Sequence, residues 1–276
     1  MDWNAAIHYA SLVAIAESVA PSGDYSAAEI NQIKAAGFTF LQPLYGDDLA
    51  TDIDPHLGDV VSFGFLAVSA TRELVAAIRG TDTILEWLHD ASYLMLQNPV
   101  TGAHGMTEDG FTAVYRSLRI GRANGTQSAK DAIGGYFDSG TAAGVTICGH
   151  SLGGALATLL TLDVGLNTSC HAPVAYTYAS PRTGDHIFAG SYNGAITSSY
   201  RIVNRQDLVP QLPPILPLPY EHVNTKYELV PPPNKINPTI VCMHHLTTYL
   251  WLMSQLAGSS AFPLDPDCTF TGADHI

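Results

Sequence analysis

A serine between two glycines is the residue of this 276-residue chain best placed to act as a nucleophile. Residues 149–153 read Gly-His-Ser-Leu-Gly, the G-x-S-x-G pattern of a nucleophile elbow. The preceding residues 145–148 are apolar, as in a buried strand, and 155–162 are mostly helix-forming Ala and Leu. Such a strand-to-helix turn lifts the serine hydroxyl out at the end of the strand. Ser151 is therefore predicted to be a nucleophile; the alternative is a plain N-cap of a buried helix.

A nucleophilic serine needs a base to take its proton and a carboxylate to orient that base. One common chain order of the three residues is Ser, then Asp or Glu, then His. Asp207 follows a predicted strand at 198–203 by one short turn, which places it at the carboxyl edge of the sheet, where sites collect. Asp163 lies inside the helix after the elbow, and Asp185 lies near the start of another helix. Asp207 is therefore the predicted acid.

The histidine is chosen among six that follow the serine, and two adjacent ones precede the last predicted helix. His222 enters a predicted strand and is predicted to be structural, bonding the loop of Asp207. The apolar spacing of residues 246–256 places His245 in the first helical turn and His244 outside it, in a loop that can aim at the serine. His244 is the predicted base, and His245 is the alternative.

An oxyanion hole requires two preorganised backbone amides. One is the N–H of Leu152, directly after the serine. The other is assigned to Thr81, because Gly80-Thr81 ends a strand of the predicted hairpin 60–79, and the Thr81 hydroxyl could be a third donor. The alternative is a threonine that only shapes a turn or caps a helix.

The segment after Thr81 is short, amphipathic and followed by Asn98-Pro99. It carries Trp87 and Leu88 and is predicted to be a helix. Its position beside the candidate site suggests a movable lid over about residues 83–97, with plain core packing as the alternative.

Strands and helices alternate along the rest of the chain, which predicts one α/β domain with a mostly parallel sheet flanked by helices. Residues 208–219 hold five prolines and are predicted to be an extended surface loop. The other predicted strands are 38–45, 145–148, 174–178 and 222–230, and the predicted helices are 1–20, 27–36, one from about 111 to 120, 128–137, 184–189 and 246–256.

The composition restricts the possible partners. Charged residues are only 13% of the chain and the mean hydropathy is +0.12, so the surface is expected to be poor in charge and able to adsorb to an apolar phase. The net charge of −13, without a Lys/Arg cluster, argues against nucleic acid and anionic membranes. Residues 1–20 contain Asp2 and Glu17 but no Lys or Arg, and fit neither a signal peptide nor a transmembrane segment.

No metal site is expected from the acidic or sulfur-bearing residues. Five aspartates between 46 and 59 lack the spacing of a calcium loop, and the four cysteines lack metal-ligand spacing. Cys148 is predicted to be a buried free thiol, whereas Cys242 could pair with Cys268 or with Cys170. The low lysine count and apolar surface favour a secreted protein over a cytoplasmic one.

In several stretches the chain resembles the class 3 lipases, the group that includes the filamentous-fungal lipases. The resemblance implies an α/β-hydrolase fold, a Ser-Asp-His triad, an oxyanion threonine or serine and a lid helix, carried here by Ser151, Asp207, Thr81 and one of the two adjacent histidines. Bacterial and plant members often show H-x-L-x-x-Y, which selects His244 and suggests a bacterial-type member. The matching stretches are 77–81 with Trp87, 110–111, 149–155, 179–184, 201–214 and 244–249.

These residues together predict a cofactor-free carboxylic ester hydrolase that forms an acyl-enzyme. The resemblance makes acylglycerols the expected substrates, at a lipid–water interface. The alternatives are a feruloyl or phospholipid esterase, a transacylase with the same residues, and a lipase-like binding protein without turnover. Oligomeric state is left open by the sequence.

Overall fold

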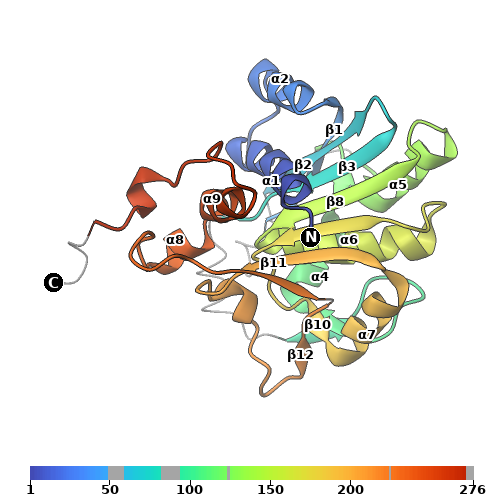
Figure 1. The fold of residues 1–276 in the computed structure, drawn as a ribbon. Helices are drawn as coiled ribbons and strands as arrows, with labels where there is room; N and C mark the ends of the chain where they lie inside the picture. Colours follow the sequence, from blue (N-terminus) through green and yellow to red (C-terminus); the bar gives the residue numbers. More distant parts are fainter. Residues whose placement is uncertain (49–58, 82–93, 123–124, 224, 272–276) are drawn as a thin grey trace.

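The computed structural model describes the chain except at residues 49–58, 82–93, 123–124, 224 and 272–276. Within the described residues a nine-stranded sheet forms the centre of the molecule, with helices on both of its faces (Figure 1). Its strands are β1 Phe38–Asp47, β2 Val60–Ser69, β3 Glu73–Ile78, β6 Arg119–Ile120, β7 Gln127–Ser128, β8 Gly144–His150, β9 Val174–Tyr178, β11 Ser198–Asn204 and β13 Lys226–Leu229. They lie side by side in the order β13-β11-β9-β8-β3-β2-β1-β6-β7.

The part of the sheet that carries the candidate site is parallel, which confirms the predicted fold class. Strands β13, β11, β9, β8 and β3 are parallel neighbours, and the antiparallel strands β2, β1, β6 and β7 extend the other side. The register pairs Ile78 with Gly149 and His150 with Tyr178. Because the carboxyl ends of parallel strands meet at one edge, the segments that follow β3, β8 and β11 come together there.

Two helical layers bury the two faces of the sheet (Figure 1). Helix α6 begins directly after Ser151 and is buried over most of its length, as its nearly unbroken run of apolar residues requires. One layer consists of α1 Trp3–Ser18, α2 Ala27–Ala35, α8 Ile240–His244 and α9 Leu246–Leu256, and the other of α4 Asp109–Ser117, α5 Ala129–Asp138, α6 Leu152–Asn167 and α7 His186–Ala195.

A second, four-stranded sheet was not foreseen from the sequence. It consists of β4 Met95–Gln97, β5 Met106–Glu108, β10 Gly184–Asp185 and β12 Tyr220–Glu221, in the order β12-β10-β5-β4. Strands of two or three residues are too short to show a period-2 pattern, so the sequence gave no signal for them.

Several predicted boundaries are wrong. The predicted lid helix would include residues 95–97, but these form β4, and residues 83–93 of that prediction, with Trp87 and Leu88, lie outside the described residues. The helix expected to reach residue 120 ends at Ser117, and the strand expected at 222–230 is confined to β13. Helix α7 starts at His186, after β10, rather than at residue 184, and it continues to Ala195.

The cysteines resolve into one disulfide and two thiols. Cys242 is bonded to Cys268, which ties α8 to the short 3₁₀ turn η2 Pro266–Cys268, whereas Cys148 and Cys170 are free and buried. The buried thiol at Cys148 was predicted. None of the helices in the described part of the chain combines the length and apolar character needed to cross a bilayer.

Candidate active site

The elbow places Ser151 in a strained conformation at the end of β8. Its φ is 57° and its ψ is −127°, an unusual combination for a residue with a side chain, and its N–H donates to the Tyr178 carbonyl at 2.9 Å. The flanking glycines are required by close packing: a Cβ on Gly149 would lie 2.1 Å from the Gly153 carbonyl oxygen, and one on Gly153 would lie 2.4 Å from that of Ile78. Because these two glycines lack side chains, β3, β8 and α6 can pack closely together beneath the serine.

Ser151, His244 and Asp207 form one hydrogen-bonded row. The Ser151 hydroxyl donates to His244 Nε2 at 2.9 Å, and His244 Nδ1–H donates to Asp207 Oδ2 at 2.9 Å. This tautomer follows because the carboxylate can only accept. All three residues are buried, Ser151 and Asp207 at 1% exposure and His244 at 7%. The structure therefore brings together the serine, acid and histidine that the sequence analysis selected.

The position of the two adjacent histidines differs from the prediction. His244 is the last residue of α8 rather than a loop residue, and His245 is the N-cap residue of α9 rather than part of its first turn. The short helix α8 was missed; the Thr239 side chain caps it by accepting from the Cys242 N–H. His245 is exposed, and its Nδ1 lies 2.8 Å from Thr247 Oγ1. His244, and not His245, contacts Ser151.

Tyr249 is a site residue that the sequence analysis did not assign. Its buried hydroxyl donates to Asp207 Oδ2 at 2.7 Å and accepts from the Asn204 N–H at 3.0 Å. The other carboxylate oxygen, Oδ1, accepts from the Val209 N–H at 3.0 Å. These donors hold Asp207 in one orientation toward His244. The sequence signal for it was the tyrosine of the H-x-L-x-x-Y pattern, which stands five residues after His244.

We expect Asp207→Asn to lower kcat by about 10⁴, because an asparagine amide facing Nδ1 favours the wrong imidazole tautomer. Steady-state hydrolysis of a chromogenic ester would measure it. Asp163→Asn is the matched control, since Asp163 lies on α6 and bonds Tyr115 rather than His244. A kcat for Asp207→Asn no lower than that of the control would contradict the assignment.

The environment of His244 keeps it in the form that can accept a proton. Burial lowers its pKa, the hydrogen bond and charge of Asp207 oppose this, and the nearby His150 lowers it further, so that the pKa lies below the ordinary value of 6.5. A base must be neutral to act, so a lowered pKa extends activity toward acid pH. We expect the acid limb of the kcat/KM profile to fall below pH 6.5; a limb above that value would contradict this environment.

The segment after β3 lies against the serine from the other side. A Cβ on Gly80 would lie 2.9 Å from Ser151 Cβ. The buried Arg79 donates from Nε to the Gly80 carbonyl at 3.0 Å and from Nη1 to the Val19 carbonyl at 2.8 Å. Because the C=O and N–H of a trans peptide point in opposite directions, the Thr81 N–H points away from Arg79. Leu152 begins α6, where no earlier helical turn accepts its N–H. The structure thus places Gly80 and the start of α6 against Ser151, and the assignment of Thr81 and Leu152 as oxyanion donors stays a prediction.

The remaining candidates lie apart from this row. His222 Nε2 is 2.6 Å from the Pro210 carbonyl, so it bonds the loop after Asp207 as predicted, and burial is the main cause that lowers its pKa to about 3. Asp185 caps α7 by accepting from the Phe188 N–H. Among the described residues, no group of three or more His, Cys, Asp or Glu side chains is arranged to hold a metal ion.

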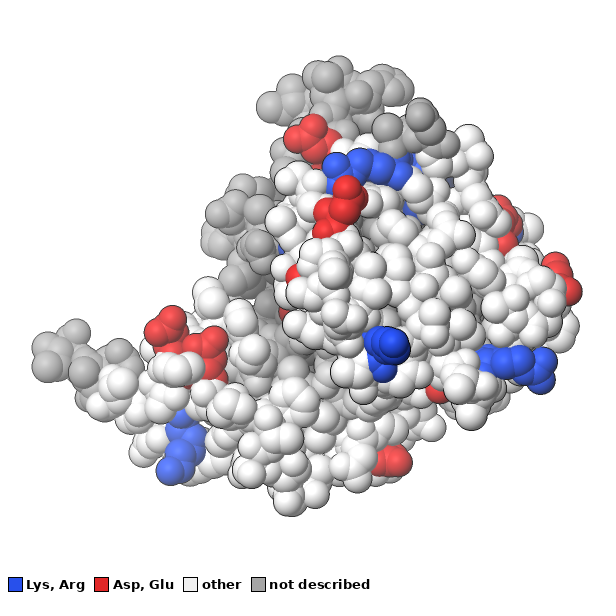
Figure 2. Space-filling view, turned by 90° about the horizontal axis from the view of Figure 1, so that it is seen from above, with Lys and Arg blue, Asp and Glu red and all other residues white. Residues whose placement is uncertain are grey.

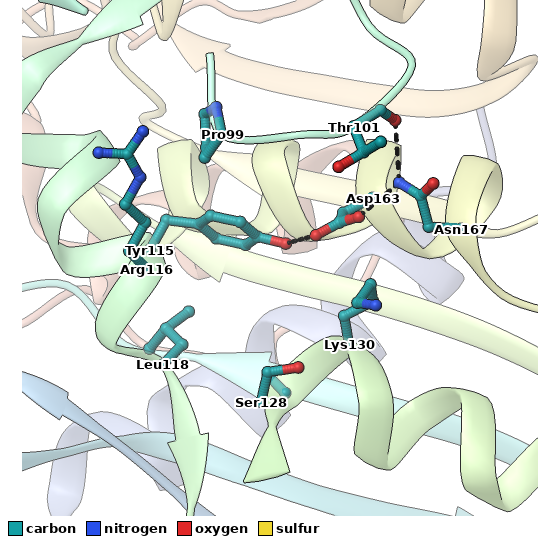
Figure 3. A pocket seen from close by; sticks show the side chains of 10 residues that line it. Pro99, Thr101, Tyr115, Arg116, Leu118, Ser128, Lys130, Asp163 and Asn167 are labelled. Atoms are coloured by element: carbon teal, nitrogen blue, oxygen red, sulfur yellow. Dashed lines mark hydrogen bonds between the residues drawn. The ribbon is translucent and has the colours of Figure 1, made fainter. Parts of the chain in front are cut away.

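A cavity of about 520 Å³ opens between α4, α5 and α6, and among the described residues its walls do not include Ser151, His244 or Asp207. In it the Tyr115 hydroxyl donates to Asp163 at 2.6 Å, while Asn167 donates to Asp163 at 2.7 Å and to the Thr101 carbonyl at 3.0 Å (Figure 3). These polar groups satisfy one another. Asp163 therefore has a structural partner and is not a rival to Asp207.

Comparison with known proteins was consistent with this geometry. Residues 75–216 match the family model for lipase (class 3). Phospholipase A1-II 6 of Oryza sativa subsp. japonica is 31% identical over 188 residues, which are 58% of this chain and 44% of that protein. Secreted mono- and diacylglycerol lipase A of Penicillium cyclopium is 31% identical over 172 residues, 62% of this chain and 53% of that protein. The chain spans about half the length of the curated relatives it matches.

The solved structures show the same fold. A lipase of Yarrowia lipolytica superposes with a TM-score of 0.61 at 21% identity, covering 86% of this chain and 82% of that one. The relatives described above come from a plant and a fungus and give no support to the expected bacterial type. Since the family model matches slightly more than half of the chain, the protein belongs to the class 3 lipase family and has the α/β-hydrolase fold of its members.

Proposed function

We propose that the chain is a carboxylic ester hydrolase in which Ser151 is the nucleophile, His244 the general base and Asp207 the residue that orients the base. The observation that carries this proposal is the pair of 2.9 Å hydrogen bonds that connects Ser151 Oγ through His244 to Asp207. The strained backbone of Ser151 supports it, because the elbow conformation presents the hydroxyl to His244 at the end of the strand.

The reaction proceeds in two halves. His244 Nε2 takes the hydroxyl proton as Ser151 Oγ attacks the ester carbonyl carbon, and the amides of Thr81 and Leu152 donate to the developing oxyanion. The imidazolium, stabilised by Asp207, returns the proton to the leaving alcohol, which leaves an acyl-enzyme. Water, deprotonated by the same histidine, then attacks the acyl carbonyl. Collapse of the second tetrahedral intermediate releases the acid, and the imidazolium returns its proton to Ser151 Oγ.

Acylglycerols are the proposed substrates, met at a lipid–water interface. The curated relative from Penicillium cyclopium is named a mono- and diacylglycerol lipase. Charged side chains are sparse on the face in Figure 2, where they appear singly or in small groups among uncharged residues. Large apolar side chains are exposed beside the candidate triad: Leu208 follows Asp207, and Ile240 and Val241 lie on the helix of His244. An apolar rim of this kind favours contact with lipid.

We propose residues 83–94, which precede β4, as a lid whose Trp87 and Leu88 contact lipid. Activity should rise when a short-chain ester passes from monomers to an emulsion, and Trp87→Ala should reduce that rise while leaving activity on monomers within about twofold. Initial rates measured below and above the solubility limit of the ester, for wild type and Trp87→Ala, test both expectations. Comparing p-nitrophenyl butyrate with p-nitrophenyl palmitate shows the preferred acyl chain length. Equal rates in the two phases together with a silent Trp87→Ala would exclude a lid.

A phospholipid ester is the second candidate substrate, because a relative 31% identical over more than half of this chain is named phospholipase A1-II 6. The same nucleophile and oxyanion donors would serve either ester. Comparing initial rates on phosphatidylcholine and on diacylglycerol of the same acyl chains, presented in matched mixed micelles, decides between them. If lysophospholipid forms faster from phosphatidylcholine than monoacylglycerol forms from diacylglycerol, the phospholipid replaces the acylglycerol as the proposed substrate.

We further propose that the protein works outside the reducing cytoplasm. The Cys242–Cys268 disulfide supports this, because such bonds persist in oxidising compartments, and so does the secreted relative named above. Fractionation of the native source, with the protein found in the cytoplasm and its thiols reduced, would refute it.

A further inference from the structure

His150, the residue before the candidate nucleophile, is buried between α1 and α8 and is not used in the reaction described above. Its Nδ1 lies 2.8 Å from Glu17 Oε1, and its Nε2 lies 2.9 Å from the backbone carbonyl oxygen of His244. A carbonyl only accepts hydrogen bonds, and so does an ionised carboxylate. With Glu17 ionised, His150 therefore donates from both nitrogens as an imidazolium. The side chain of His150 is 7% exposed and that of Glu17 is 29% exposed.

The carbonyl that His150 holds is at a junction between two helices. His244 ends α8, and the last carbonyls of a helix have no partner within it. The carbonyl of His245, not that of His244, accepts the hydrogen bonds of the first turn of α9, which the Thr248 and Tyr249 N–H groups donate. On the other side, the Asn204 side chain donates to the Met243 carbonyl at 2.8 Å. His150 and Asn204 thus fix the backbone immediately around the base.

The two imidazoles also lie in contact. The ring centroids of His150 and His244 are 4.8 Å apart with planes tilted by 32°, so a charge on His150 acts directly on the base. We propose that Glu17 is a positioning residue: by holding a protonated His150 it fixes the His244 backbone, keeps the imidazole between Ser151 and Asp207, and maintains a positive charge beside it. This rests on the proposed role of His244 as the base.

The charges around the pair support this arrangement. Burial raises the pKa of Glu17, but the charge and hydrogen bond of His150 outweigh it, with smaller contributions from Arg79 and His245, and the net shift is downward. Burial lowers the pKa of His150, but Glu17 outweighs it, helped by the His244 carbonyl and by the charge of Asp207, and the net shift is upward. From α9, the Tyr249 ring lies 6.1 Å from that of His150.

Two substitutions of Glu17 separate charge from hydrogen bonding. Glu17→Gln keeps the shape and can donate to Nδ1, so that neutral His150 still donates from Nε2 to the carbonyl while the positive charge is lost. Glu17→Gln removes two charges near His244: the positive charge of His150, which is nearer, and the negative charge of Glu17, which is more distant. Because the nearer charge has the larger effect, the pKa of His244 should rise. The acid limb of kcat/KM should then move up by about one pH unit. Glu17→Ala also loses the hydrogen bond, and its kcat should fall about tenfold with KM within about twofold.

Tyr9→Phe is the matched control on the same helix. The Tyr9 hydroxyl donates to Glu73 Oε1 and so links α1 to the sheet away from His150. This variant should lose stability but keep the wild-type kcat and acid limb; an equal shift in Tyr9→Phe would reduce Glu17 to a helix-docking residue. Histidine NMR adds a second readout, because the His150 ring should stay protonated to higher pH in the wild type than in Glu17→Gln.

The outcomes distinguish this inference from the proposed function. Ser151→Ala is assayed in the same series. If Ser151→Ala is inactive while both Glu17 variants keep the wild-type kcat and acid limb, the inference about Glu17 is wrong and the triad stands. If Ser151→Ala keeps its activity, the proposed function fails and the role of Glu17 fails with it. Circular dichroism verifies that each variant is folded.

Discussion

Ser151→Ala is expected to lower kcat by about 10⁶. The residual rate would come from the oxyanion donors and substrate binding alone, because without Oγ no acyl-enzyme can form. The side chain is buried and its hydroxyl bonds only His244 among the described contacts, so folding should change little. Hydrolysis of p-nitrophenyl butyrate by purified enzyme measures the loss, with protein concentration raised until the residual rate exceeds the blank.

Ser254→Ala is the control for removing a buried serine hydroxyl. Ser254 is fully buried in α9 and its hydroxyl donates to the Trp251 carbonyl, away from the candidate site. Its kcat should stay within about twofold of wild type even if its stability falls by about 1 kcal/mol. A Ser151→Ala variant that retained a tenth or more of the wild-type kcat would exclude the serine mechanism.

His244→Ala is expected to cause a loss of similar size, because a serine hydroxyl without a base is a poor nucleophile at neutral pH. Its Nε2 lies 2.9 Å from Ser151 Oγ and its Nδ1 lies 2.9 Å from Asp207. The same ester assay measures it, and rescue of part of the activity by added imidazole would show that the missing function is proton transfer.

His245→Ala is the adjacent control. His245 is exposed and faces Thr247, so its removal should leave kcat within about twofold of wild type. If His245→Ala instead lost most of its activity while His244→Ala kept it, the base would have been assigned to the wrong member of the pair.

The residues that could be selected from the sequence owe this to local patterns. The elbow sequence around Ser151 is contiguous, and a tight turn between an apolar strand and an Ala/Leu-rich helix has few alternatives. Asp207 follows a strand by one turn, so its place at the sheet edge follows from the parallel order alone. The predicted α/β fold was right for the same reason, because alternating strands and helices restrict the topology.

The parts that the sequence did not reveal depend on contacts between distant residues. Helix α8 has five residues, too few for a hydrophobic period, and it is held by the Thr239 cap and the Cys242–Cys268 disulfide. This is why the relative placement of the two histidines was predicted incorrectly although His244 was chosen. The short strands of the second sheet were not predicted for the same reason, because they too have few residues.

The positioning contacts of the site were invisible for a further reason. Glu17 and His150 are 133 residues apart in the chain, and Tyr249 is 42 residues from Asp207. Glu17 is the one charged residue between residues 3 and 18, but nothing in the local sequence says which side chain it meets. Only the packing of α1 and α9 on one face of the sheet brings these side chains close to His244, the proposed base.

The most direct test of the account is covalent labelling of the active wild-type enzyme with a fluorophosphonate, read by intact mass and by mapping of the modified peptide. The proposed mechanism predicts one adduct per chain, on Ser151, with activity lost in proportion, no adduct on Ser151→Ala and slow labelling of His244→Ala. An adduct on another residue that accompanies the loss of activity, or full labelling of the chain without loss of activity, would contradict Ser151 as the nucleophile.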